Sequence, residues 1–168
     1  TVRVTMKVQD NLESTRAVSQ IFSSLRNDLR DFVSLSPGGA KISLSFGETQ
    51  VPETAEFSQV LKITKQVDRI TYRLIESGGK RYVERTVDGS AGEAGPRRLF
   101  GVPRMKDFGV LYVKSQNRFD ALLKNVGQLI VRVTVDSEDQ RFASKEVRIT
   151  SVFFSDRLAD DDWNHLDL

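Results

Sequence analysis

The chain has 168 residues, of which 39% are hydrophobic and 29% are charged, which suffices for one ordinary globular core and is short for two. It contains no cysteine, so a disulfide framework and a thiolate metal site are excluded. No apolar run approaches the ~20 residues that cross a bilayer, and no segment resembles a signal peptide. The net charge of +2 hides an asymmetry, because residues 156–168 hold five acidic residues and one basic residue, against 18 acidic and 24 basic residues elsewhere.

The basic residues of the body are scattered along alternating positions of the predicted strands, such as Lys62, Arg69 and Arg73. A nucleic-acid binder more often concentrates lysine and arginine on one element, with aromatic residues among them. Alternating charges are instead typical of a solvated sheet face. We therefore expect these charges to serve mainly solubility, and nucleic acid is not the partner that the sequence favours.

The first third of the chain predicts one long amphipathic helix from about Val8 to Val33. Asp10 or Asn11 is the expected N-cap, and the helix is expected to end at 36–39, where a proline precedes two glycines. The apolar residues recur mostly at steps of three and four, so they form one stripe. The residues of this stripe that we expect to form a helix–sheet core are Val18, Phe22, Leu25, Leu29 and Phe32.

After residue 39 the period of the apolar residues changes from about 3.6 to 2, the period of β-strands. Strands are predicted at 41–46, 59–64 and 107–114. A polar loop is predicted at 47–57, and a loop rich in glycine and small residues at 88–96. The connections are short, and helix and strand do not alternate, which excludes a doubly wound α/β fold.

The clearest local unit is a hairpin, in which β-rich runs at 69–76 and 80–87 are joined by Ser77–Gly79. Glycine supplies the positive φ angles of such a tight turn. Alternating apolar residues also predict strands at 128–136 and 145–154, which a charged turn separates. We expect these last two strands to form an antiparallel pair.

Together these elements predict an α+β fold, with one long N-terminal amphipathic helix packed on antiparallel β-sheet. The predicted parts are the helix at 1–33, a β-rich globular part of the same domain at 34–155, and an acidic, loosely ordered tail at 156–168. Residues 118–126 are compatible with a short helical turn or with irregular structure. The strand order is left open.

The search for catalytic and metal-binding residues returns mostly absences. The single histidine, His165, lies in the acidic tail, and no phosphate-binding, dinucleotide-binding or hydrolase motif is present. Asp160, Asp161 and Asp162 are weak candidates for Ca²⁺ ligands, because they are consecutive and lack the glycine of an EF-hand loop. We therefore predict no catalytic residue, no cofactor and no metal. An enzyme that uses two carboxylates stays open, although no pair of acids stands out.

Seven short segments, which alternate in the manner of strands or form a Gly-Gly turn, together carry a resemblance to a known family. These segments are Ile70–Leu74, Gly78–Gly79, Tyr82–Arg85, Leu99–Val102, Phe108–Tyr112, Leu129–Val135 and Val147–Phe154. With the preceding amphipathic helix, they resemble the soluble domains of minor pilins and pseudopilins. The chain looks most like the J component of type II secretion and the W-type minor pilins of type IV pili.

The resemblance implies that the α+β fold is pilin-like. It also implies a structural role, as a low-abundance subunit near the tip of a filament that helps to start its assembly. It also implies other minor subunits as partners, a periplasmic location, and an inner-membrane anchor in the full-length protein. That anchor would be an apolar helical segment before Thr1, with a peptidase site and an early glutamate. The sequence does not distinguish a secretion system from a pilus.

Recognition in such a filament would occur by packing. Val4, Val8 and Leu12 are the predicted partner interface, because the N-terminal spine that carries them is expected to project beyond the sheet and lie open to neighbouring subunits. A competing interpretation makes Val2, Val4 and Val8 a frayed end or a short strand, in keeping with their β-branched side chains. A different function stays open as well: a periplasmic or surface binding module for adhesion or DNA uptake. It would contact an acidic ligand through basic residues at 97–106, namely Arg97, Arg98, Arg104 and Lys106.

Overall fold

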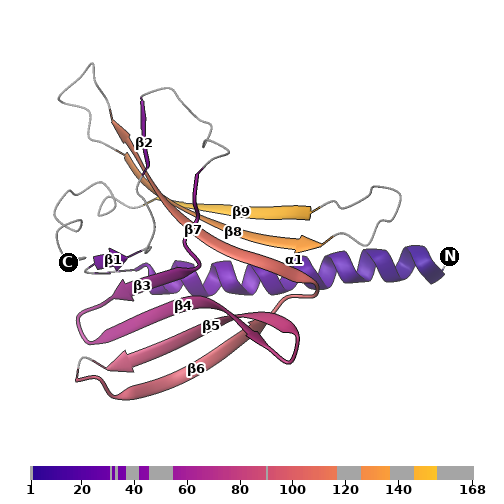
Figure 1. Cartoon of the computed structure of the whole chain (residues 1–168), viewed down its shortest axis with the longest axis horizontal. Coiled ribbons are helices and arrows are strands. Elements are labelled where there is room, and N and C mark those ends of the chain that lie inside the picture. The colour runs from indigo at the N-terminus through magenta and orange to yellow at the C-terminus, as the bar shows by residue number, and fades with distance from the viewer. Residues whose placement is uncertain are drawn as a thin grey trace.

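The computed structural model describes residues 2–30, 32, 34–36, 42–45, 55–89, 91–116, 126–136 and 146–154. These residues form one helix, α1 (Val2–Asp28), and nine strands, which Figure 1 shows in place. The strands are β1 (Ser34–Ser36), β2 (Ile42–Ser45), β3 (Val60–Thr64), β4 (Asp68–Ser77), β5 (Lys80–Gly89), β6 (Ala94–Gly101), β7 (Met105–Gln116), β8 (Val126–Asp136) and β9 (Glu146–Phe154).

The strands are divided between two sheets. One has five strands in the order β1-β3-β4-β5-β6, and the other has four strands in the order β2-β7-β8-β9. All neighbouring strands pair antiparallel except β2 and β7, which are parallel. The chain therefore leaves the five-stranded sheet after β1, contributes β2 to the other sheet, and returns for β3.

The predicted α+β, pilin-like fold, with a long helix packed on antiparallel sheet, is wrong. Strands make up most of the described residues, and two mostly antiparallel sheets build the molecule. One large hydrophobic cluster joins buried residues of both sheets. Among the side chains that the structure describes, α1 contributes Val18, Ile21 and Leu25 to its buried residues, and the strands contribute most of the others. The core is thus supplied mainly by the inner faces of the sheets.

Helix α1 buries one row of side chains, formed by Ser14, Val18, Ile21, Leu25 and Asp28 among the residues from 13 onward. The steps of three and four put them on one face, as the sequence predicts. The predicted start near Val8 and the predicted end at Val33 are both wrong, because α1 begins at Val2 and ends at Asp28. Beyond this end Leu35 is fully buried in β1, which pairs with β3, so at this position the apolar pattern belongs to a strand.

The predicted hairpin is confirmed. Strands β4 and β5 pair in register from Asp68↔Gly89 to Ser77↔Lys80. Gly78 and Gly79 have φ angles of 60° and 75°, a left-handed conformation that side chains with a Cβ rarely adopt. This hairpin forms the centre of the five-stranded sheet.

Strands β5 and β6 occupy the two ends of the loop predicted at 88–96, so that prediction is wrong at residues 88–89 and 94–96. Gly95 and Pro96 are unfavourable within a sheet, but β6 is an edge strand and needs hydrogen bonds on one side only. Strands β2, β3, β7, β8 and β9 lie within a few residues of the predicted ranges, and the antiparallel pairing of β8 with β9 is confirmed. Three predicted parts lie outside the described residues. They are residues 47–54 of the loop predicted at 47–57, residues 118–125 of the segment 118–126, and the tail at 156–168.

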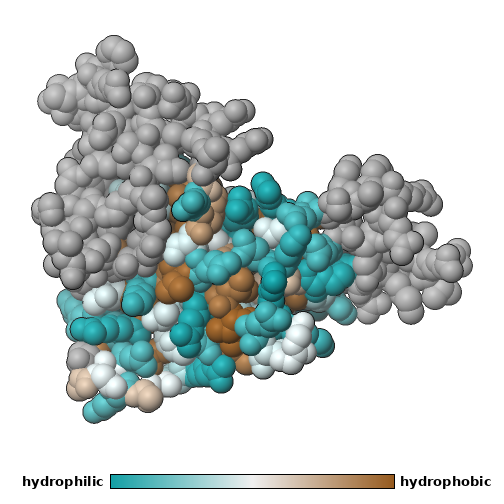
Figure 2. Space-filling view, in the orientation of Figure 1, coloured by the Kyte–Doolittle hydropathy of each residue, from teal (hydrophilic) through white to brown (hydrophobic). Residues whose placement is uncertain are grey.

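Figure 2 shows a patch of hydrophobic residues in the middle of one face of the molecule, bordered by hydrophilic residues. On the outer face of the four-stranded sheet, a smaller buried group of Leu111, Val113 and Ile130 is partly covered by Ala55 and Phe57. A backbone pairing between Ser58 and Val110 fixes the covering segment to β7. In the described part of the chain, α1 lacks a stretch apolar enough to span a membrane.

Candidate functional site

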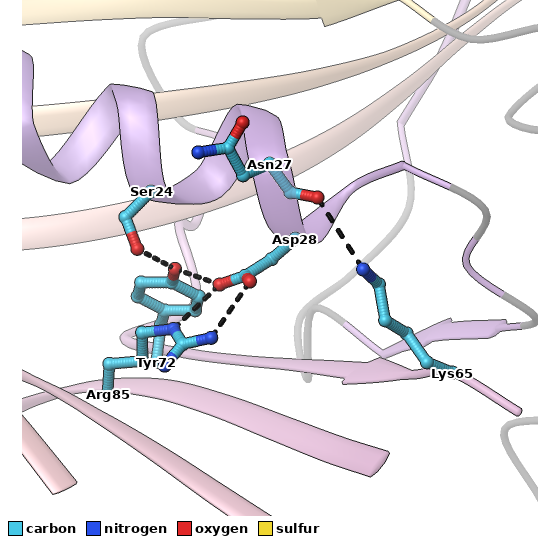
Figure 3. Close-up of polar contacts among 6 residues, drawn as sticks. All are labelled: Ser24, Asn27, Asp28, Lys65, Tyr72 and Arg85. Atoms are coloured by element: carbon cyan, nitrogen blue, oxygen red, sulfur yellow. Dashed lines mark hydrogen bonds and ion pairs between the residues drawn. The ribbon is translucent and has the colours of Figure 1, made fainter. Parts of the chain in front are cut away.

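A buried polar cluster holds the C-terminal end of α1 against the five-stranded sheet (Figure 3). Asp28, the last residue of the helix, is 7% exposed. Arg85 donates two hydrogen bonds to its carboxylate, from Nε to Oδ2 at 2.8 Å and from Nη2 to Oδ1 at 2.9 Å. The Tyr72 hydroxyl donates to the same Oδ2 and lies 2.6 Å from the Ser24 hydroxyl. Because the tyrosine proton is given to Asp28, Ser24 is the donor to Tyr72.

The sequence brings these residues together through two ordinary periodicities. Ser24 and Asp28 are four residues apart and share one face of the helix. Tyr72 and Arg85 are cross-strand partners of β4 and β5, so both project from the inner face of the sheet. A carboxylate at a helix C-terminus faces the negative end of the helix dipole, and the guanidinium offsets that repulsion.

The electrostatics of the cluster favour a structural role. Burial, followed by the hydrogen bond to Asp28, raises the pKa of Tyr72 well above its usual range. The hydrogen bond to Asp28 raises the pKa of Arg85 further above its already high value. Both groups therefore stay protonated near neutral pH, and both carboxylate oxygens of Asp28 accept hydrogen bonds. The arrangement suits an anchor for the helix better than acid–base chemistry.

A polar groove of about 550 Å³ opens beside this cluster, lined by residues of α1, β5 and β6. Arg16 and Arg98 lie on its walls, and the guanidinium of Arg98 stacks 4.4 Å from the ring centroid of Phe100. At the end of the helix, Lys65 donates a long hydrogen bond of 3.5 Å to the carbonyl of Asn27. One polar side of the helix thus lies open in the groove, beside the anchor.

A second ionic group lies on the outer face of the five-stranded sheet. Glu84 is 3% exposed and accepts hydrogen bonds from Arg73 Nε at 2.9 Å and from Arg97 Nε at 2.6 Å. Burial alone would raise the pKa of Glu84, but the hydrogen bonds and charges of the two arginines outweigh it and lower the pKa. This ion pair ties β6, the edge strand, to β4 across β5.

A lowered pKa in the folded state means that Glu84 stabilises the protein above its unfolded pKa of about 4.3 and loses this contribution as the pH falls through the folded value. We expect Glu84→Gln to reduce stability at pH 7 by about 1–2 kcal/mol. We also expect a smaller further loss than in the wild type between pH 5 and pH 3. Urea unfolding at several pH values measures both effects, and Glu93→Gln, at an exposed position, is the control. Parallel pH profiles of the wild type and Glu84→Gln would contradict this assignment.

The predicted helix–sheet core residues occupy three kinds of place. Val18 and Leu25 are buried on α1, and Phe32 is buried beyond its end. Phe22 and Leu29 are half-buried and pack against the hydrophobic core. The predicted partner interface, Val4, Val8 and Leu12, lies on α1, where helical spacing puts the three residues on one face. Their position excludes the competing interpretation of Val2, Val4 and Val8 as a short strand.

The basic residues predicted to contact an acidic ligand do not form one surface. Arg97 and Arg98 are consecutive in β6, so they project to opposite faces of the sheet, the first toward Glu84 and the second into the groove. Arg104 and Lys106 line a separate cavity at the turn between β6 and β7. The four residues therefore divide among three environments.

Within the described ranges, no group of three acidic or histidine side chains is placed to hold a metal ion. The weak calcium candidates Asp160, Asp161 and Asp162, and the single histidine, lie outside those ranges. Sequence reasoning gave the Asp28 cluster no role. The available signal was a charged residue at an apolar helix position, three residues after Leu25 and seven after Ile21.

The chain was compared with protein families, with curated proteins and with solved structures. No family model matches the chain, and neither the curated proteins nor the solved structures include a significant match.

Proposed function

We propose that this protein is a structural subunit that assembles with other subunits through the N-terminal part of α1, as a minor pilin or pseudopilin of a type IV pilus or type II secretion filament. The observation that carries the proposal is the course of the helix. In Figure 1 its N-terminal part extends past the ends of the strands of both sheets. An extended helix that leaves the body of the protein offers a surface for packing against other helices.

The anchor at the other end of α1 supports this function. The bidentate Asp28–Arg85 pair and the Tyr72 hydroxyl fix the last turn of the helix on the sheet. The buried Val18, Ile21 and Leu25 fix the turns before it. A helix held over this length presents its projecting part in a defined direction, so less conformational entropy is lost when a partner packs against it.

The residues assigned to the interface are Val4, Val8 and Leu12, and the partners are subunits that carry a similar N-terminal helix. In this proposal the protein is not an enzyme, is held in the inner membrane by a segment before Thr1, and works in the periplasm. The binding-module function receives less support, because the four basic residues that it needs are divided among three environments.

Site-specific photo-crosslinking in cells that express the full-length protein tests this function. A photoreactive amino acid at Val8 is expected to capture other filament subunits, recognised by mass spectrometry as proteins that themselves begin with an apolar helix. The matched control is the same amino acid at Lys62, which is exposed on β3. The proposal fails if Val8 captures no such protein, or if Val8 and Lys62 capture the same set.

A further inference from the structure

A second cavity of about 740 Å³ lies where the tip of the β4–β5 hairpin meets the turn between β6 and β7. Gly79 and Lys80 line it from the hairpin, and Val102, Pro103 and Arg104 line it from the turn. A hydrogen bond of 3.0 Å from the Asp136 amide to the Arg104 carbonyl connects the end of β8 to the same place. Two turns and the end of β8, which are distant in sequence, thus line one site.

The lining of this cavity combines positive charge with apolar surface. Its charged residues are the cations Lys80, Arg81, Arg104 and Lys106 and the acids Glu76 and Asp136. Tyr82, Val102, Pro103 and Met105 supply apolar surface beside them. A phosphate or another small anion would use the charges alone, whereas an acidic peptide would use both kinds of surface.

Internal contacts fix part of the lining in place. Arg81 donates a hydrogen bond to the Lys106 carbonyl, and the Lys106 ammonium pairs with Glu146 of β9. Arg104 has a φ of 56°, the only positive φ among the non-glycine residues of the described chain. Such a conformation is costly for a side chain with a Cβ and concentrates at functional turns.

The position of the cavity relates it to the proposed assembly surface. In Figure 1 the β4–β5 hairpin tip, the start of β7 and the end of β8 all lie at the end of the molecule from which the N-terminal part of α1 projects. A subunit that packs along the projecting helix would therefore pass close to the mouth of this cavity.

We infer that this basic cavity binds an acidic peptide segment of an adjacent protein, with Lys80, Arg81 and Arg104 contacting its carboxylates. The identification of that protein as a filament subunit rests on the proposed function. The preference of the cavity for an acidic peptide does not, because it follows from the charges and apolar walls alone.

A fluorescently labelled peptide with the sequence of residues 156–168 is a suitable probe, because it carries five acidic residues together with leucines and a tryptophan. Fluorescence anisotropy with the full chain is expected to show saturable binding that weakens as salt is raised. Lys80→Glu and Arg81→Glu should each raise the Kd about tenfold, because each replaces an attraction by a repulsion. Lys62→Glu, an exposed change of the same charge outside the cavity, should leave the Kd within about twofold.

A control peptide with asparagine in place of Asp160, Asp161 and Asp162 should bind much more weakly than the probe. The inference is overturned if the probe does not bind, if both peptides bind equally, or if Lys62→Glu weakens binding as much as Lys80→Glu. The crosslinks from Val8 are read independently, so a failed peptide titration with the crosslinks intact removes the cavity assignment and leaves the proposed function standing. The opposite pattern removes the proposed function alone.

Discussion

Replacing Asp28 with alanine is expected to destabilise the protein by about 3 kcal/mol, because it leaves a largely buried guanidinium and a buried hydroxyl without their acceptor. Asp28 is the shared partner of Arg85 and Tyr72, and all three are on the inner side of the sheet. The Arg85 side chain keeps 22% of its exposure, so water reaches part of it and the loss should fall at the lower end of the range for broken buried pairs. Urea unfolding at pH 7 measures the change.

Two companion variants show whether the loss comes from the cluster. Tyr72→Phe keeps the ion pair and removes one hydroxyl, so it should cost only about 1–2 kcal/mol. Glu13→Ala removes an exposed carboxylate from the same helix and should change stability by less than about 0.5 kcal/mol. Hydrogen exchange should also accelerate in the last turns of α1 in the Asp28→Ala protein. If Asp28→Ala is as mild as Glu13→Ala, the cluster does not anchor the helix.

Local chemistry explains which parts of the fold the sequence predicts well. The β4–β5 hairpin depends on two adjacent glycines and on alternation within ten-residue strands, and both are visible in a short window. The same holds for β8 and β9, whose apolar residues alternate almost without interruption. No tertiary contact is needed to recognise these elements.

The division into two sheets depends on contacts that a short window does not contain. Strand β1 has only three residues, and it forms because Leu35 pairs with Ile63 of β3. Strand β2 pairs in parallel with the C-terminal end of β7, which is about 70 residues away in sequence. Strand β6 contains Gly95 and Pro96, which locally favour a loop, and ten-residue β5 supplies the pairing that overrides this preference. The fold class was therefore wrong although most of the strands were right.

The candidate sites also combine features that are visible in the sequence with contacts that are not. The charge of Asp28 at an apolar helix position signals a buried polar contact, but its partners lie 44 and 57 residues further along the chain. The basic residues at 97–106 suggest one charged loop, whereas strand geometry sends Arg97 and Arg98 to opposite faces. Lys80 and Arg81 join Arg104 only through the packing of two turns. Sequence reasoning identifies such residues more readily than it groups them.

Gly109→Ala is expected to destabilise the protein by about 2 kcal/mol, the usual cost of overpacking a site that cannot relax. A Cβ at Gly109 would lie 2.7 Å from the Phe57 Cβ and 3.2 Å from its ring. Hydrogen bonds of 2.9 and 2.8 Å between Ser58 and Val110 hold the backbone next to Phe57, so the ring cannot simply swing away. The ring of Phe57 also contacts Arg132, whose guanidinium lies 3.8 Å from the ring centroid.

A double-mutant cycle isolates this contact. Phe57→Gly alone should cost about 3 kcal/mol, because it removes a half-buried ring, its Cβ and its cation–π contact with Arg132, and it frees the backbone. In that background a methyl group at Gly109 meets neither a Cβ nor a ring at position 57, so Gly109→Ala should cost less than about 0.5 kcal/mol more. Additive effects of the two substitutions in thermal or urea unfolding would show that the Phe57 side chain does not pack against Gly109. Strong coupling would establish that a glycine in the middle of β7 is required by the segment that covers the outer face of the sheet.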